Sequence, residues 1–176
     1  MARKMRVAGH ERATRARARD PDSNWCAFRD DDHGIAGMSL TTQQVALVQV
    51  TFRSVQPMSA TAAELFYKRL FEIEPDTAAL FKGDMRRQGR EFMQVLAVAV
   101  GGLSNLSTLV PMVQQLGVRH AGYGVRASHY DAVRQALLYT LAVILQDEYT
   151  DEVRSAWASA YAMLAGIMKE AAWGAP

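Results

Sequence analysis

The chain has 176 residues, of which 49% are hydrophobic and 22% are charged, so it is long enough for one globular domain with a sizeable core. Its single cysteine, Cys26, excludes a disulfide framework and a cysteine-rich zinc site. A reducing compartment is consistent with this, and we expect a cytoplasmic protein. No apolar run approaches the roughly 18 residues of a membrane span, and no apolar stretch follows the basic N-terminus as it would in a secretory signal.

Charge is distributed unevenly along the chain. Residues 1–19 contain seven Lys or Arg and one Glu, residues 20–32 contain five Asp and one Arg, and later positions contain 12 of each sign. Residues 1–38 also have no sustained apolar stripe, so we expect a disordered extension there and the folded domain over 39–176. A basic arm for nucleic acid and a start codon assigned upstream of Met38 are the other interpretations. The neutral body argues against nucleic-acid binding.

The first half of the body has helical periodicity. In 41–55, apolar residues recur at three- and four-residue spacing, at Val45, Val48, Phe52 and Val55, and Pro57 follows. A second helix is predicted over 59–73, with Thr61 and Glu64 at the spacing of a capping box. Pro75 suits the first turn of a short helix over 75–81.

The second half continues the helical pattern. Further helices are predicted over 85–103, 106–122, 128–146 and 150–173. Pro111 falls near the start of one, and Ser128 with Asp131 has capping-box spacing before another. In the last helix, Thr150 is the expected cap and Lys169 is placed to complement the helix dipole near the C-terminal end. No run alternates with the period of a strand, so the sequence predicts an all-α fold with six to eight helices.

Two segments carry a family resemblance. "LFYKRLFEIEPDTAALF" (65–81) and "LGVRHAGYGV" (116–125) resemble the globin family, and in particular bacterial single-domain globins near the flavohaemoglobin and neuroglobin branch. The likeness extends over about residues 42–172. Phe81 matches the phenylalanine that globins place against the haem, and Trp157 and Tyr161 resemble residues of the C-terminal helix pair. The resemblance implies a globin fold, a sandwich of three helices on three.

The same resemblance assigns a role to His120. A lone histidine at the end of an apolar segment is more often structural than a ligand. At this position, however, globins carry the proximal histidine that binds the iron of haem b. We expect its other ring nitrogen to donate to the carbonyl of Leu116, which would orient the ring. His129 begins a later helix, and we expect it on the surface with no role in metal binding.

The resemblance also implies a distal pocket. Counting back from His120 without a gap reaches Gln88, and Phe92 follows one helical turn later. Tyr67 falls in the second helix, at the position that points over bound gas, and Phe81 lies at the haem edge. A slip of one residue in this register would replace Gln88 with Arg87 or Gly89.

Tyr67 and Gln88 carry the expected chemistry. Tyrosine offers an O–H and glutamine an N–H₂ to bound oxygen, which takes on negative charge. We therefore expect high oxygen affinity and slow release, and CO and NO are the other expected ligands. Such a pocket also suits nitric oxide dioxygenation. Whether the protein is an enzyme stays open. Since we expect no reductase domain after the globin, that activity would need an external reductase.

One part of the proximal pattern departs from the flavohaemoglobins. Those relatives place a glutamate near the proximal histidine late in the last helix. Here the corresponding residue is Ala172, and Glu170 is two positions away, although Tyr130 matches the tyrosine of that network. Two alternatives to an oxygen-binding globin therefore remain: a haem-based sensor, or a partner-binding globin module without turnover. A haem-free DNA-binding domain rests only on the basic leader.

Overall fold

A computed structural model of the chain describes residues 39–174, and the predictions for residues 1–38 lie outside them. The described part contains no strand and consists of six α-helices and three short 3₁₀-helices. In chain order these are α1 (Thr42–Val55), η2 (Gln56–Met58), α2 (Ser59–Ile73), η3 (Pro75–Leu80), α3 (Met85–Gly102), α4 (Leu106–Gly122), α5 (His129–Leu145), η4 (Gln146–Glu148) and α6 (Asp151–Trp173). The predicted all-α class and helix order are confirmed.

Side-chain caps define the beginnings of α1 and α6. The Thr41 side chain accepts from the Gln44 backbone N–H at 3.1 Å, and Gln44 accepts from the Thr41 backbone N–H at 2.9 Å. This reciprocal capping box carries the sequence pattern T-x-x-Q. Thr150 caps α6 as predicted, accepting from the backbone N–H of Val153.

Several predicted helix-end details are wrong. Thr61 lies inside α2, because Pro57 starts a 3₁₀ turn and α2 follows it directly from Ser59, without a side-chain cap. Ser128 has helical backbone angles and makes no capping hydrogen bond. The last turn of α6 contains no basic residue, and Lys169 lies over the Tyr130 ring instead. Pro111 lies inside α4, beyond its first turn.

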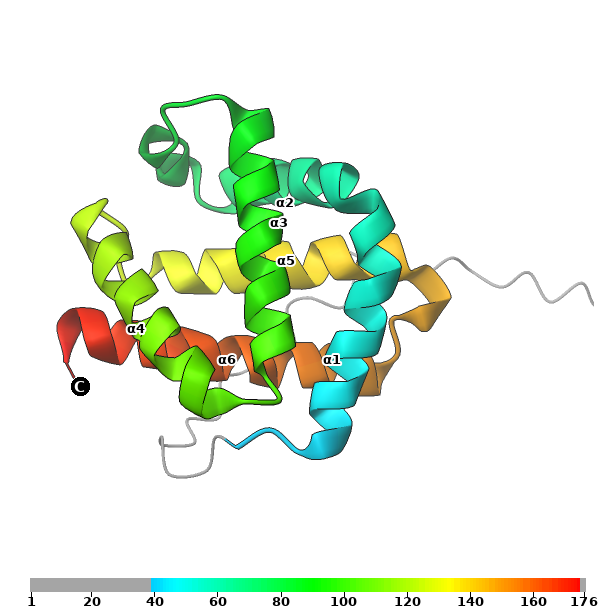
Figure 1. Ribbon diagram of the computed structural model, residues 1–176. Coiled ribbons are helices and arrows are strands. Elements are labelled where there is room, and N and C mark those ends of the chain that lie inside the picture. Colours follow the sequence, from blue (N-terminus) through cyan, green and yellow to red (C-terminus); the bar gives the residue numbers. More distant parts are fainter. Residues whose placement is uncertain (1–38, 175–176) are drawn as a thin grey trace, which may run out of the picture.

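The helices pack in two crossed layers (Figure 1). The most extensive packing joins α4 with α6, α2 with α5, α1 with α6, and α2 with α3. Two of these crossings depend on glycine. A Cβ on Gly117 would lie 2.3 Å from the Met168 carbonyl oxygen in α6, and a Cβ on Gly89 would lie 2.9 Å from the Ala63 Cβ in α2.

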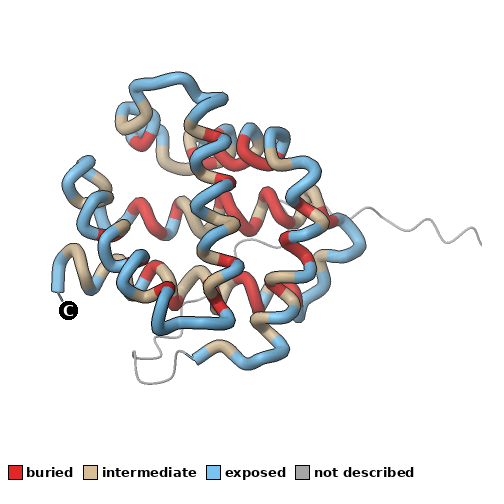
Figure 2. Tube along the Cα trace, viewed as in Figure 1, coloured by how far each residue is buried: buried red, intermediate tan, exposed pale blue. Residues whose placement is uncertain are grey.

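The core runs through the centre of both layers, where α1, α2, α5 and α6 turn their buried sides inward (Figure 2). Trp157 is 2% exposed, and its indole N–H donates to the Thr51 hydroxyl at 2.9 Å. Thr51 in turn donates to the Leu47 carbonyl at 2.7 Å, so the buried polar atoms of this α1–α6 contact are paired.

The helices α3 and α4 are joined by a short turn and diverge from it, forming a V (Figure 1). Gln88 lies near the free end of α3, and His120 lies near the free end of α4. The two predicted halves of the site therefore come from different helices, and the fold places them at the open end of the V.

Candidate functional site

An aromatic cluster forms where α2, α3 and the end of η3 meet. Tyr67 in α2 is 6% exposed, and its ring meets the Phe81 ring edge-on with centroids 5.1 Å apart. The Phe92 ring of α3 stacks on Phe66 at 4.2 Å and lies 5.9 Å from Tyr67. Three of the predicted distal residues therefore belong to one packed group, and Phe66 is a member that the sequence argument left without a role.

The hydroxyl of Tyr67 lies beside the Gln88 side chain. Burial raises the pKa of Tyr67, and the hydrogen bond from Gln88 opposes this by stabilising the charged form. Because the net shift is upward, Tyr67 keeps its proton at neutral pH and remains a donor.

A surface cavity of about 320 Å³ opens beside this pair and is lined by Gly83, Asp84, Arg87, Gln88 and Glu91. Arg87 points outward, with its side chain 73% exposed, and its Nε donates to Glu91 at 2.8 Å. Gly89, on the other side of Gln88, is buried against α2. Of the three consecutive residues, Gln88 is therefore the one that reaches Tyr67.

His120 is oriented by its own helix. Its Nδ1 lies 2.8 Å from the Leu116 carbonyl oxygen, as expected, and donates to it. Burial lowers the pKa of His120, which favours the neutral ring at pH 7. A neutral imidazole that donates through Nδ1 carries a lone pair on Nε2. Within residues 39–174, Nε2 makes no hydrogen bond, so this nitrogen is available as a ligand.

Tyr130 of α5 lies beside His120, with ring centroids 6.4 Å apart. Its hydroxyl is buried and makes no hydrogen bond to any residue that the structure describes. Trp173 meets the Tyr130 ring edge-on at 6.0 Å, and the Lys169 ammonium lies 5.6 Å from the ring centroid. The Tyr130 hydroxyl therefore has no carboxylate partner among the described residues.

Both arms of the V carry apolar side chains that are open to solvent. On α3, Val95 continues the helix face of Gln88 and Phe92 and is 47% exposed. On α4, Met112 continues the face of Leu116 and His120 and is 48% exposed. Large side chains exposed on the same faces as the site residues are the lining that a flat apolar group would cover.

The donor set also fits haem. Within the described residues, no group of three or more His, Cys, Asp or Glu side chains is arranged to hold a metal ion. A single neutral histidine suits an iron whose other ligands come from a porphyrin.

In the same part of the chain, no helix is long and apolar enough to cross a membrane.

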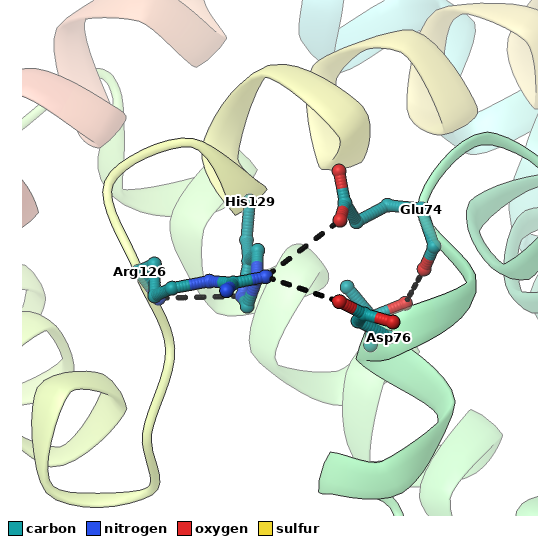
Figure 3. Close-up of polar contacts among 5 residues, drawn as sticks. Glu74, Asp76, Arg126 and His129 are labelled. Atoms are coloured by element: carbon teal, nitrogen blue, oxygen red, sulfur yellow. Dashed lines mark hydrogen bonds and ion pairs between the residues drawn. The ribbon is translucent and has the colours of Figure 1, made fainter.

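The structure brings Tyr67, Phe81, Gln88 and Phe92 together and places Leu116 against His120 on the other arm of the V. One sequence expectation is wrong: His129 is 4% exposed and buried. Its ring is covered by Arg126, which also approaches Glu74 and Asp76 (Figure 3). Glu74 and Asp76 are far in the sequence from Arg126 and His129, and no motif predicted that the two pairs would meet.

Comparison with known proteins defines the class. The Globin family model matches residues 64–168, so the chain belongs to the globin family. Membership implies haem binding and the binding of diatomic gases.

Among curated proteins, the chain is similar to flavohemoproteins. It is 32% identical over 133 residues to that of Bordetella parapertussis and 31% identical over 133 residues to that of Chromobacterium violaceum. Each alignment covers 73% of this chain and 33% of the relative, so the chain spans about a third of the length of these proteins. It is thus a bacterial-type globin related to the flavohaemoglobins.

Solved structures agree on the fold. An engineered variant of a putative nitric oxide dioxygenase from Rhodothermus marinus aligns with TM-score 0.68 and 27% identity, covering 76% of this chain and 93% of that one. A globin from Campylobacter jejuni aligns with TM-score 0.66 and 21% identity, covering 75% and 96%. A hexacoordinated heme protein from a tardigrade aligns with TM-score 0.69 and 17% identity, covering 77% and 96%. The last two show the fold alone.

Proposed function

We propose that this globin binds oxygen tightly on haem b, with His120 as the iron ligand and Tyr67 and Gln88 as the distal donors. We also propose that it removes nitric oxide when an external reductase supplies electrons. The observation that carries the proposal is the Tyr67 hydroxyl with the Gln88 side chain beside it, on a ring that packs against Phe81 and Phe92.

His120 performs the proximal task through its protonation state and orientation. Haem, when bound, supplies an iron that takes up a diatomic gas. The lowered pKa of His120 keeps the ring neutral, and the Nδ1 hydrogen bond to Leu116 fixes which nitrogen carries the lone pair. Gln88 offers no imidazole on the opposite side, so the ferrous protein is expected to keep a free coordination position.

Tyr67 performs the distal task by donating to the gas. Gln88 lies beside the tyrosine hydroxyl and would be the second donor. A hydrogen bond to a charged acceptor stabilises by about 1.5–3 kcal/mol. Tyr67 would therefore favour a gas that takes on negative charge, as oxygen does more than carbon monoxide, and would slow its release by roughly tenfold to a hundredfold.

The proposed nitric oxide activity is suggested by the relatives. The relatives that the chain matches are flavohemoproteins, and one structural neighbour is described as a putative nitric oxide dioxygenase. The unpartnered hydroxyl of Tyr130 argues for modest turnover, because no carboxylate acts through it on His120 within the described residues. We therefore propose that oxygen binding is the primary property and nitric oxide removal the secondary one.

Stopped-flow measurement of oxygen release tests the proposal. Tyr67→Phe is expected to accelerate release by about tenfold to a hundredfold, since it removes the donor and keeps the ring. Tyr149→Phe is the matched control. Tyr149 is also a largely buried tyrosine, whose pKa burial raises to about 12, but it follows η4 and takes no part in the site. Equal release rates in the wild type and Tyr67→Phe would contradict the proposed distal role.

Nitric oxide consumption is measured separately, with a generic flavin reductase and NADH supplied. Steady consumption at a rate set by the reductase concentration would support the enzymatic proposal. A single turnover followed by arrest, with excess reductase present, would restrict the protein to oxygen binding.

A further inference from the structure

The loop between α4 and α5 is tied to the 3₁₀-helix η3 by one arginine. The Arg126 guanidinium lies 3.7 Å from a Glu74 carboxylate oxygen and 3.7 Å from an Asp76 carboxylate oxygen, both at the beginning of η3 (Figure 3). Its Nε lies 2.9 Å from Nε2 of His129, the first residue of α5. We call Glu74, Asp76, Arg126 and His129 the clasp.

The two sides of the clasp are built on fixed positions. His129 is 4% exposed, and Arg126 approaches both of its ring nitrogens: Nε lies 2.9 Å from Nε2, and the backbone N–H lies 3.2 Å from Nδ1. A neutral imidazole accepts at one nitrogen only, and either choice joins the ring to Arg126. On the other side, the buried Thr77 hydroxyl donates to the Glu74 carbonyl at 2.6 Å. The arginine therefore bridges two anchored segments of the chain.

A second contact joins the same two segments further along. Leu80, at the end of η3, approaches Gly124, whose Cβ, if present, would lie 3.7 Å from a Leu80 methyl group. Gly124 has φ +87°, a conformation that residues with side chains rarely adopt. The α4–α5 loop thus contacts η3 both at the beginning and at the end of that 3₁₀-helix.

The clasp connects the two halves of the site. On the loop side, the Val125 N–H donates to the His120 carbonyl at 3.0 Å. On the other side, η3 runs directly into Phe81, whose ring lies 5.1 Å from the Tyr67 ring. Because α3 and α4 diverge, the clasp spans the open end of the V.

We propose that Arg126 is a positioning residue that holds the His120 loop and the Phe81 segment at a fixed separation, and thereby retains the cofactor between them. The part that concerns the cofactor rests on the proposed function. The carboxylate contacts are exposed, and such ion pairs contribute little to global stability. Loss of the clasp is therefore expected to raise the rate of local opening and to leave cooperative unfolding nearly unchanged.

Hydrogen exchange on the full chain, as purified and before hemin is added, tests the mechanical part. Arg126→Ala is expected to accelerate exchange by about tenfold in both 75–81 and 121–128. Arg154→Ala is the matched control, because it removes an exposed arginine that pairs with Asp151 at the beginning of α6. Acceleration in the loop alone would overturn the proposal, since η3 would then not depend on Arg126.

Haem loss tests the second part. In protein loaded with hemin, Arg126→Ala is expected to transfer its haem to an apomyoglobin acceptor about five to ten times faster than the wild type and Arg154→Ala. A Glu74→Gln/Asp76→Asn variant should reproduce most of this effect, and adding Arg126→Ala to it should add little. An unchanged rate in Arg126→Ala would overturn the retention role. A wild type that takes up no haem would refute the proposed function, whereas the exchange result would still decide whether the clasp exists.

Discussion

The polar side chains on the two arms of the V have different surroundings. On the distal side, the Tyr67 hydroxyl lies beside the Gln88 side chain, and the Tyr67 ring belongs to a cluster of aromatic rings in mutual contact. On the proximal side, the His120 ring makes a hydrogen bond within its own helix, and the neighbouring Tyr130 hydroxyl is buried without a partner in the described chain. The distal side is therefore organised for donation, and the His120 ring has no polar support from another helix within the described residues.

This difference indicates where each arm gets its rigidity. The distal side is held by aromatic packing, in which the rings of Phe66, Phe92 and Tyr67 support one another. The proximal helix is held by close backbone approach, since Gly117 brings α4 directly against the Met168 backbone of α6. Ring packing tolerates small shifts, whereas contact between two backbones does not.

The largest expected effect comes from adding one methyl group to each arm of the V, which tests whether the two arms are held differently. Gly117→Ala is expected to lower the free energy of unfolding by about 3 kcal/mol, because the new Cβ meets backbone that cannot turn away. Gly89→Ala should cost about 1 kcal/mol, since the clash is with one methyl and the helix gains stability from alanine. Urea denaturation of both variants measures the difference.

Gly101→Ala is the control for that pair. It lies in α3 with nothing within 4 Å of the new Cβ, so it should stabilise the protein by about 0.5–1 kcal/mol. Equal losses at Gly117 and Gly89 would contradict the view that the two arms are held differently.

A smaller effect separates the two tyrosines at the α5–α6 contact. Tyr161 donates its hydroxyl proton to the Tyr130 carbonyl at 2.7 Å, so Tyr161→Phe is expected to cost about 1 kcal/mol. Tyr130→Phe should be neutral or slightly stabilising, because it removes a buried hydroxyl that is unpaired in the described chain. Thermal denaturation of the two variants checks the order. A Tyr130→Phe loss equal to that of Tyr161→Phe would reveal a partner for the Tyr130 hydroxyl.

The smallest expected effect is the acid dependence of the protein before hemin is added. Burial lowers the pKa of His120 in the folded chain below its ordinary value of 6.5. The unfolded chain therefore binds this proton first as the pH falls, and stability should decrease below about pH 6.5 and level off below the folded pKa. His120→Ala should lose this part of the pH dependence. Denaturation midpoints measured between pH 4.5 and 7.5, with an unchanged profile in the variant, would contradict it.

The sequence predicted the helices well because each carries its own apolar period, as Val48, Phe52 and Val55 show in α1. It failed at helix ends. Thr61 and Ser128 have the right chemistry for caps, but Thr61 follows residues that are already in α2, and Ser128 itself has helical backbone angles. A cap needs an extended residue before the helix, and that geometry depends on the connection rather than on the capping residue.

Only part of the site was predictable from the sequence and the family resemblance. The family resemblance assigned Tyr67, Gln88 and His120 to positions of the globin pattern, and those roles stay proposals that depend on the register. The clasp was not predictable, because Arg126 and Glu74 belong to segments with no shared pattern and meet only through the tertiary fold. His129 was misplaced for the same reason, since its polar type suggested the surface while the fold buries it beneath Arg126.

The role of His120 as iron ligand is tested most directly by the absorption spectrum of the hemin-loaded protein before and after reduction, with His120→Gly measured alongside. In the wild type we expect a Soret band that, after reduction, has the position typical of five-coordinate haem. In His120→Gly that spectrum should be lost or displaced, and added imidazole should restore it, since imidazole replaces the missing ring as iron ligand. Identical spectra for the two proteins, with no response to imidazole, would show that His120 does not hold the iron.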